Sequence, residues 1–475
     1  MSKPVKMTLF IVGGFVVLLL FAAVALLLFL DVDSYQPQLE TAASETLGLE
    51  TRVGGELGLR LFPRLQLTLG EVQLAQQGAE VGTIKEVRLG IGLLALLASQ
   101  IEIRTLTLIQ PNIFIERGRA GNFNFERPEA AGGSWPGLDF SSIAITGGTL
   151  HFADQQSGAS LEALDCSLTA GQLQLPGGNS ADVLQTLSFK AGVVCGEIRT
   201  HDLTATDVMF SANGKPGVID LDPVTMQIFG ARGSSSLQAE FSGAVPRYEV
   251  RYDLPKFRIE DFFKTLSPQK FAEGSMDFSA NLTMQGRTWN EIKSSMAGKI
   301  LLQGEKLKIH GRDLDQEFDR FESSQNFNLV DVGAIFIAGP FGLLVTKGYN
   351  FASILQGSGG ESEIRHLRSD WQVEHGTAKA RDVALATGQH RVALQGELDF
   401  VNETFNDVTV ALIDAEGCTK VRQTIRGSFQ NPEVEQPSVL KSLTGPVRKL
   451  IKLGRELFPG GECEEFYAGS VAAPN

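Results

Sequence analysis

The sequence predicts a mainly β protein that one N-terminal helix holds in a membrane, and three observations support this. A long uncharged apolar segment opens the chain, apolar and polar residues alternate along much of the remainder, and helical patterns are scarce. Alternation with period two is typical of strands with one apolar and one polar face. We therefore expect a transmembrane helix followed by an elongated, curled antiparallel β-sheet with few short helices and a candidate hydrophobic groove.

The first element is the apolar segment Thr8–Leu30, which contains no charged residue. About 20 apolar residues are enough for a helix to cross a membrane, and a helix satisfies its own backbone groups in lipid. Lys3 and Lys6 precede the segment and Asp31 and Asp33 follow it. The positive-inside rule therefore places the N-terminus in the cytoplasm and the bulk of the chain across the membrane. A cleaved signal peptide is the alternative, but its apolar region is only about 7–15 residues long.

The region after this helix shows the strand pattern. Leucines alternate with other residues at Leu57 and Leu59 and again at Leu65, Leu67 and Leu69. The alternation returns in segments 84–91, 141–152, 298–311, 391–400 and 407–414. Turn residues separate these segments, which indicates roughly 25 strands joined mainly as antiparallel hairpins. Two packed sheets or one curled sheet with an apolar trough would both hide the apolar faces, and the periodicity leaves both arrangements open.

Helical patterns are few. Residues 34–47 are expected to form a short helix or a linker, and short helices are predicted at 261–266 and 314–321. The clearest pattern is Pro446–Phe458, in which apolar and basic residues fall on opposite faces. Its basic residues are Arg448, Lys449, Lys452 and Arg455. Such a helix either lies on an anionic membrane surface or caps the end of the sheet with its basic face in solvent.

These elements divide the chain into a cytoplasmic tail (1–7), a transmembrane helix (8–30), a β-structure (31–435) and a C-terminal region (436–475) with the basic helix. Four cysteines lie beyond the membrane helix, namely Cys166, Cys195, Cys418 and Cys463. An even number in an oxidising compartment suggests two disulfides. Proximity along the chain favours Cys166–Cys195 and Cys418–Cys463, and free buried thiols are the alternative.

Composition and motifs argue against several functions. The formal net charge of −13 disfavours nucleic-acid binding. The sequence contains no GxSxG, P-loop, GxGxxG or HExxH motif, and its six histidines are scattered. The acidic stretch 313–319 lacks the glycine that a calcium loop needs at its sixth position, and we interpret it as a solvated helix face. We therefore expect no enzymatic activity, no metal and no cofactor.

Several phrases, in this order and spacing, resemble the AsmA family. They are found at 46–75 (TLGLETRVGGELGLRLFPRLQLTLGEVQLA), 101–125, 203–241, 298–318, 418–434 and 461–474. The resemblance extends over essentially the whole chain, although the pair Cys166 and Cys195 has no clear place in the family pattern. It implies an inner-membrane protein with N-terminus in the cytoplasm and bulk in the periplasm, with a role in outer-membrane biogenesis.

The resemblance also implies a β-structure with a hydrophobic groove that binds phospholipid. Leu57, Leu59, Leu65, Leu67 and Leu69 are the candidate lipid-facing residues, although core packing would require the same alternation. The sequence thus predicts a protein that binds or transfers phospholipid, with the inner membrane and phospholipid as partners. The alternative is a non-catalytic scaffold that binds outer-membrane assembly factors through its sheet edges.

Overall fold

The structure is a computed structural model that describes residues 36–60, 65–92, 103–125, 138–156, 158–175, 185–201, 203–265, 271–324, 336, 359–435, 438–439 and 465–474. The chain divides into two compact units, Met1–Gly217 and Val218–Asn475 (units 1 and 2). Thr8–Leu30 and the basic helix Pro446–Phe458 lie outside the described residues. Within the described ranges, no helix is long and apolar enough to cross a membrane.

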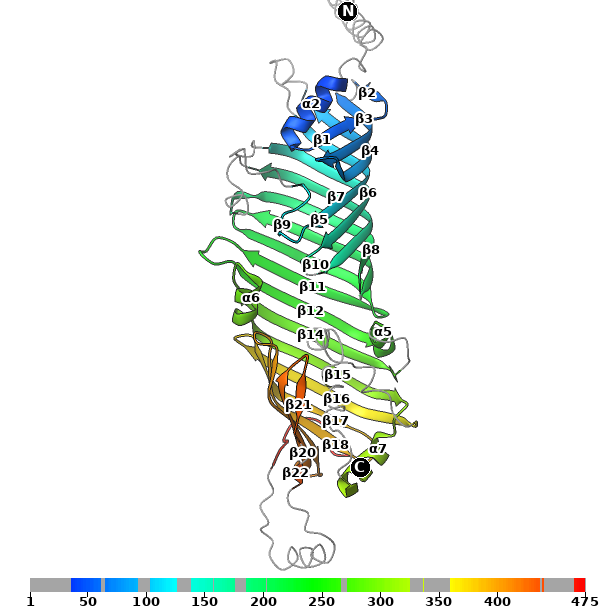
Figure 1. Cartoon of the computed structure of the whole chain (residues 1–475), viewed down its shortest axis with the longest axis vertical. Helices are drawn as coiled ribbons and strands as arrows, with labels where there is room; N and C mark the ends of the chain where they lie inside the picture. Colours follow the sequence, from blue (N-terminus) through cyan, green and yellow to red (C-terminus); the bar gives the residue numbers. More distant parts are fainter. Residues whose placement is uncertain are drawn as a thin grey trace, which may run out of the picture. The chain divides into compact units, whose positions relative to one another are not determined.

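The described part of unit 1 contains a short helix and an open sheet made mostly of long strands (Figure 1). The helix is α2 (Gln36–Leu47), within the segment predicted as a short helix or linker. The strands are β1 (Glu50–Val53), β2 (Leu57–Arg60), β3 (Gln66–Gln76), β4 (Ala79–Ile91), β5 (Ile103–Arg117), β6 (Leu138–Asp154), β7 (Ser160–Leu175), β8 (Ser188–Thr200) and β9 (Thr204–Lys215). Strands β1 and β2 share one edge of β3, and β3 to β9 then pair in chain order.

Most of these pairings are antiparallel, as the sequence predicts, but β5 and β6 run parallel. A parallel pair needs a connection that crosses back to the starting end of the sheet. The chain leaves β5 at Arg117 and enters β6 at Leu138, which allows such a crossing. The predicted antiparallel sheet, joined mainly by hairpins, is therefore a mixed sheet in which β5 and β6 form the parallel pair among the described strands.

Helix α2 covers the edge of β1 that faces away from β3. Gln36 and Glu40 both bind the backbone of Val53. Gln36 Nε2 donates to the Val53 carbonyl oxygen (2.6 Å), and the Val53 N–H donates to Glu40 Oε1 (2.8 Å). One turn further along, Ser44 Oγ accepts the N–H of Thr51 (2.9 Å). Residues at intervals of four share a helix face, so three side chains replace the hydrogen bonds of a missing neighbour strand.

Among its described residues, unit 2 contains a second run of antiparallel strands and three short helices (Figure 1). The strands are β10 (Val218–Ile228), β11 (Ala231–Glu240), β12 (Arg247–Arg258), β13 (Ala272–Glu273), β14 (Ser275–Gln285), β15 (Ala297–His310), β16 (Glu361–Glu374), β17 (Thr377–Ala386), β18 (Arg391–Asp399), β19 (Thr404–Ile413), β20 (Thr419–Ser428), β21 (Pro432–Val434) and β22 (Ser438–Val439). The helices are α5 (Ile259–Lys264), α6 (Trp289–Ser295) and α7 (Leu314–Ser324). Helices α5 and α7 correspond to predicted helices, whereas α6 was not predicted.

The core of unit 2 is densely packed. Its largest fully buried side chains are Trp371, Phe257, Phe262, Phe318 and Phe336. Ser369 Oγ donates to the carbonyl oxygen of Phe336 (2.7 Å) and accepts the indole N–H of Trp371 (2.7 Å), so both of these buried side chains are hydrogen-bonded. Helices α5 and α7 supply Phe262 and Phe318, which explains why short helices occur at these two connections.

The C-terminal segment 465–474 packs on strands β17 to β19. Phe466, Tyr467 and Val471 are buried against alanines of these strands. Arg391 Nη1 donates to the carbonyl oxygen of Val471 (2.9 Å), and its guanidinium lies over the Tyr467 ring at 5.5 Å. This segment is therefore an integral part of the unit 2 core.

Candidate functional site

The apolar face of unit 1 is formed by residues that lie directly opposite one another on successive strands. One row, from β2 to β9, consists of Leu57, Leu69, Val87, Leu108, Ile145, Leu168, Val193 and Phe210. The neighbouring row consists of Leu59, Leu67, Leu89, Leu106, Ile143, Ala170, Ala191 and Ala212. We call these two sets the apolar rows. No polar residue interrupts either of them.

The opposite face carries polar and small residues at the positions between the apolar rows. From β3 to β9 these are Thr68, Arg88, Thr107, Ala144, Thr169, Gly192 and Ser211. Because successive side chains of a strand point to opposite faces, unit 1 has one continuous apolar face and one predominantly polar face.

The apolar alternation breaks along one line that crosses the sheet. On β3 the apolar residue after Leu69 is Val72, and on β5 the next residue on the apolar face after Leu108 is Pro111, so the spacing is three residues instead of two. The intervening residues Glu71 and Gln110 both have left-handed backbone (φ 48°). The same conformation recurs at Gly147, Asp165 and Asp207 on β6, β7 and β9. Such residues re-aim the side chains that follow, so apolar residues on both sides of the break face the same way.

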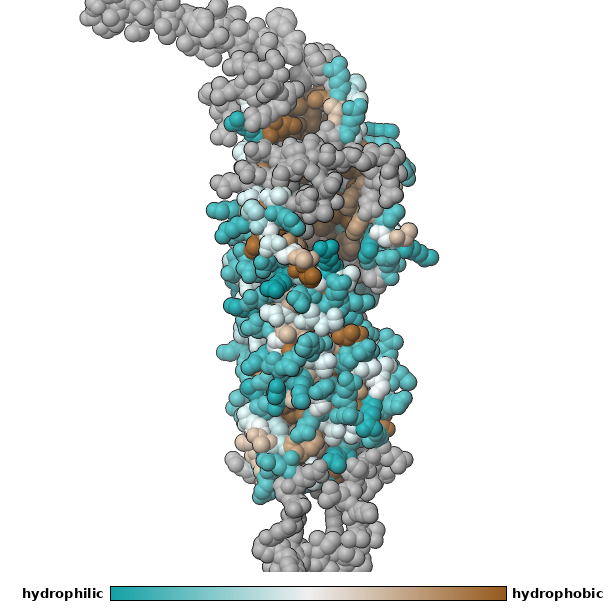
Figure 2. All heavy atoms as spheres, turned by 90° about the vertical axis from the view of Figure 1, so that its left-hand side faces the viewer, coloured by the Kyte–Doolittle hydropathy of each residue, from teal (hydrophilic) through white to brown (hydrophobic). Residues whose placement is uncertain are grey.

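The side chains of the apolar rows are mostly half-buried rather than enclosed. Val87 of the first row belongs to a small buried cluster with Val53, Val72 and Ile84, and leucines of β2 to β5 pack against this cluster. Figure 2 shows apolar side chains gathered in a hollow in the upper part of the view. Unit 2 differs, because Ile364, Val392 and Leu412 are completely buried.

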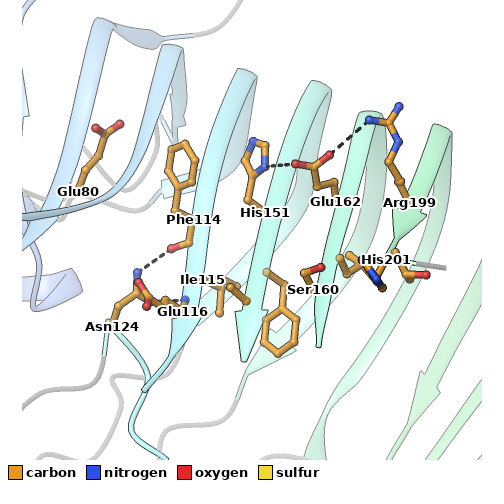
Figure 3. Close-up of a pocket in the computed structure, with 14 residues that line it drawn as sticks. Glu80, Phe114, Ile115, Glu116, Asn124, His151, Ser160, Glu162, Arg199 and His201 are labelled. Carbon is orange, nitrogen blue, oxygen red and sulfur yellow. Dashed lines mark hydrogen bonds and ion pairs between the residues drawn. The ribbon is translucent and has the colours of Figure 1, made fainter. Parts of the chain in front are cut away.

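A pocket of about 350 Å³, lined by both polar and apolar side chains, lies near one end of strands β5 to β8 (Figure 3). Phe114, His151, Glu162 and Arg199 are cross-strand neighbours there. The Phe114 and His151 rings stack at 4.8 Å, His151 Nδ1 is 3.3 Å from Glu162 Oε1, and Arg199 Nη1 is 3.7 Å from Glu162 Oε2. These polar groups bind one another, and the described lining residues include no nucleophile held by a base.

The shifted pKa values in the described residues belong to structural contacts. Burial alone would raise the pKa of Asp382, but hydrogen bonds from Ser470 and Tyr467 hold it below its ordinary value. Burial raises the pKa of Tyr252 to about 12, which keeps this phenol neutral. Within the described ranges, no group of three potential ligands is arranged to hold a metal ion.

The sequence-predicted leucines fall on the apolar face. Leu57 and Leu69 are opposite each other in the first apolar row, and Leu59 and Leu67 in the second. Leu65 directly precedes β3 and is only 5% exposed. The sequence prediction captured the first two strands but missed the continuation of both rows to β9, which depends on strand register.

The cysteine predictions have separate outcomes. Cys166 and Cys195 are directly opposite on β7 and β8 and form a disulfide, as predicted. Cys418 is also disulfide-bonded, and its proposed partner Cys463 lies outside the described residues. The basic residues Arg448, Lys449, Lys452 and Arg455 lie there too, so their role remains a prediction.

The fold and site together define a mainly β protein with an open mixed sheet and one long, half-exposed apolar face. Residues 1–183 match the model of the AsmA family. This match confirms the predicted resemblance to the family over the N-terminal part of the chain, and it supports a broad role in cell-envelope biogenesis. No curated protein matches the chain closely enough to count as a relative.

Proposed function

We propose that the chain binds phospholipid acyl chains on the apolar rows of unit 1. In this proposal it is a non-catalytic, inner-membrane-anchored periplasmic protein of cell-envelope biogenesis that passes phospholipid toward the outer membrane. The observation that carries the proposal is the unbroken apolar lining of two neighbouring rows across eight strands.

The dimensions and burial of the rows suit a lipid. At about 4.8 Å between strands, eight strands extend each row over about 34 Å, which exceeds the roughly 15 Å depth of one leaflet's hydrocarbon. Transfer of an acyl chain out of water gains about 0.8 kcal/mol per buried CH₂ group. Half-buried leucines provide such a surface, whereas the enclosed core of unit 2 offers none.

A photo-crosslinking amino acid at Leu168 tests this proposal, with Thr169 as the matched control. The two positions are adjacent on β7, and Leu168 lies in an apolar row whereas Thr169 lies on the polar face. We expect phospholipid adducts at Leu168 in intact cells and few at Thr169. Absence of adducts at Leu168, or equal yields at the two positions, would contradict the proposal.

The second candidate function is a scaffold for outer-membrane assembly factors, and one observation favours it. Strand β2 pairs with β3 on one side and with no described strand on the other. An open strand edge can accept a strand from a partner protein. A crosslinker at Arg60 that captures protein, combined with no lipid at Leu168, would favour the scaffold.

A further inference from the structure

His390 lies in the turn between β17 and β18 and is only 7% exposed. Its two ring nitrogens face two carboxylates of α7: Nδ1 is 3.0 Å from Asp315 Oδ1, and Nε2 is 3.3 Å from Asp319 Oδ1. Asp315 and Asp319 are four residues apart, so they share one face of the helix. The imidazole therefore joins α7 to the turn through both of its nitrogens.

The number of protons on the His390 ring decides whether both ring nitrogens can donate hydrogen bonds to the two carboxylates. A neutral imidazole has one N–H donor, and its other nitrogen is an acceptor. An ionised carboxylate only accepts hydrogen bonds. Both contacts of His390 are favourable together only when the ring carries two protons. A neutral ring would place a lone pair against one of the carboxylates.

The other groups around a neutral His390 ring do not supply the second hydrogen-bond donor that the two carboxylates require. Asp315 also accepts a hydrogen bond from Thr387 Oγ1 in the same turn. The Phe318 ring meets the imidazole edge-on at 5.5 Å. The nearest cation in sequence, Arg391, directs its guanidinium to the backbone carbonyls of Asp414, Ala415 and Val471. At the start of α7, Arg312 lies 3.8 Å from Glu317.

We propose that His390 is a proton-linked clamp that fastens α7 to the β17–β18 turn at acid pH and weakens as the pH rises. Histidine side chains change charge between about pH 5 and 8, and only a ring with two N–H groups can donate to Asp315 and Asp319 together. Helix α7 buries Leu314 (1% exposed) and Phe318 (0% exposed) in unit 2. Release of the clamp would therefore loosen the packing of α7 over the unit 2 core. This inference does not depend on whether unit 1 binds lipid.

Hydrogen exchange on the full-length protein in detergent micelles tests the clamp. We expect the protection factors of the α7 amides, corrected for intrinsic exchange, to fall roughly tenfold between pH 5.5 and 8, the effect of weakening one charge-assisted hydrogen bond. Asp319→Asn is the decisive variant, because an amide can donate to a neutral Nε2 while Nδ1–H still donates to Asp315. Asp319 is largely exposed, so the variant should fold, keep its α7 protection and lose the pH dependence.

His310 provides an internal control. Its ring bridges Glu273 (2.8 Å) and Glu361 (3.0 Å) in a similar way, but it lies at the end of β15, before α7 begins, and contacts neither Asp315 nor Asp319. Asp319→Asn should leave the pH response of the amides around Glu273 unchanged. Wild-type α7 protection that does not change with pH would overturn the proposal. An Asp319→Asn variant with an unaltered pH response would overturn it equally.

Discussion

The disulfide between Cys166 and Cys195 constrains strands β7 and β8, and its removal should have a large effect on unit 1. The two residues are 29 positions apart in the chain. A closed loop of that length lowers the entropy of the unfolded chain by about 12 cal/mol/K, which corresponds to about 3.6 kcal/mol at 25 °C. Cys195 is 3% exposed, so loss of its sulfur adds about 1 kcal/mol for the cavity.

The Cys166→Ala, Cys195→Ala double variant measures this contribution without leaving a free thiol. We expect the opening free energy of the β7 and β8 amides, measured by hydrogen exchange under native conditions, to fall by about 4.5 kcal/mol. Amides of β16 and β17 in unit 2 are the control and should keep their values. A loss below about 1 kcal/mol would refute the entropic argument, because the unfolded chain would then already hold β7 and β8 together.

Three further variants probe the edge of β1 and the C-terminal segment. Hydrogen bonds from Val53 and Gln36 hold the pKa of Glu40 below its ordinary value. The stability that these hydrogen bonds give the folded protein is therefore present at neutral pH and is lost as the pH falls through that lowered value. Protection of the Val53 amide against hydrogen exchange should drop in acid for the wild type but not for Glu40→Gln. Arg391→Ala leaves backbone carbonyls unpaired in a buried setting and should cost about 3 kcal/mol, seen as faster proteolysis of segment 465–474. Gly417→Ala should release the same segment, because its φ is +89° and a Cβ there would lie 2.0 Å from the Tyr467 carbonyl oxygen.

The strands were predictable where one residue type alternates over a long stretch. The leucines at 65, 67 and 69 define β3, and the change of phase at Val72 is visible in the sequence as well. Its cause is not, because Glu71 is an ordinary surface residue by type and only the structure shows its left-handed backbone. The disulfide was predictable for a different reason, since a separation of 29 residues suits two neighbouring strands and their connection.

Contacts between residues far apart in the chain were beyond sequence reasoning. The acidic stretch 313–319 was interpreted as a solvated helix face, and the helix is present as α7. Asp315 and Asp319, however, bind His390, which lies 75 residues beyond Asp315 in sequence. A single sequence contains no sign of that pairing, because helix periodicity describes only the spacing within α7.

The contrast between the units follows from what covers each apolar face. In unit 2, short helices at two connections bring Phe262 and Phe318 onto the sheet, and the carbonyl oxygen of the buried Phe336 accepts a hydrogen bond from Ser369. In unit 1, the one described helix of regular length, α2, binds the edge of β1 rather than the apolar face. The same period-two alternation therefore yields an enclosed core in one unit and a half-exposed face in the other. Alternation alone states only that a face is apolar, and the connections between strands decide whether protein or another apolar molecule covers it.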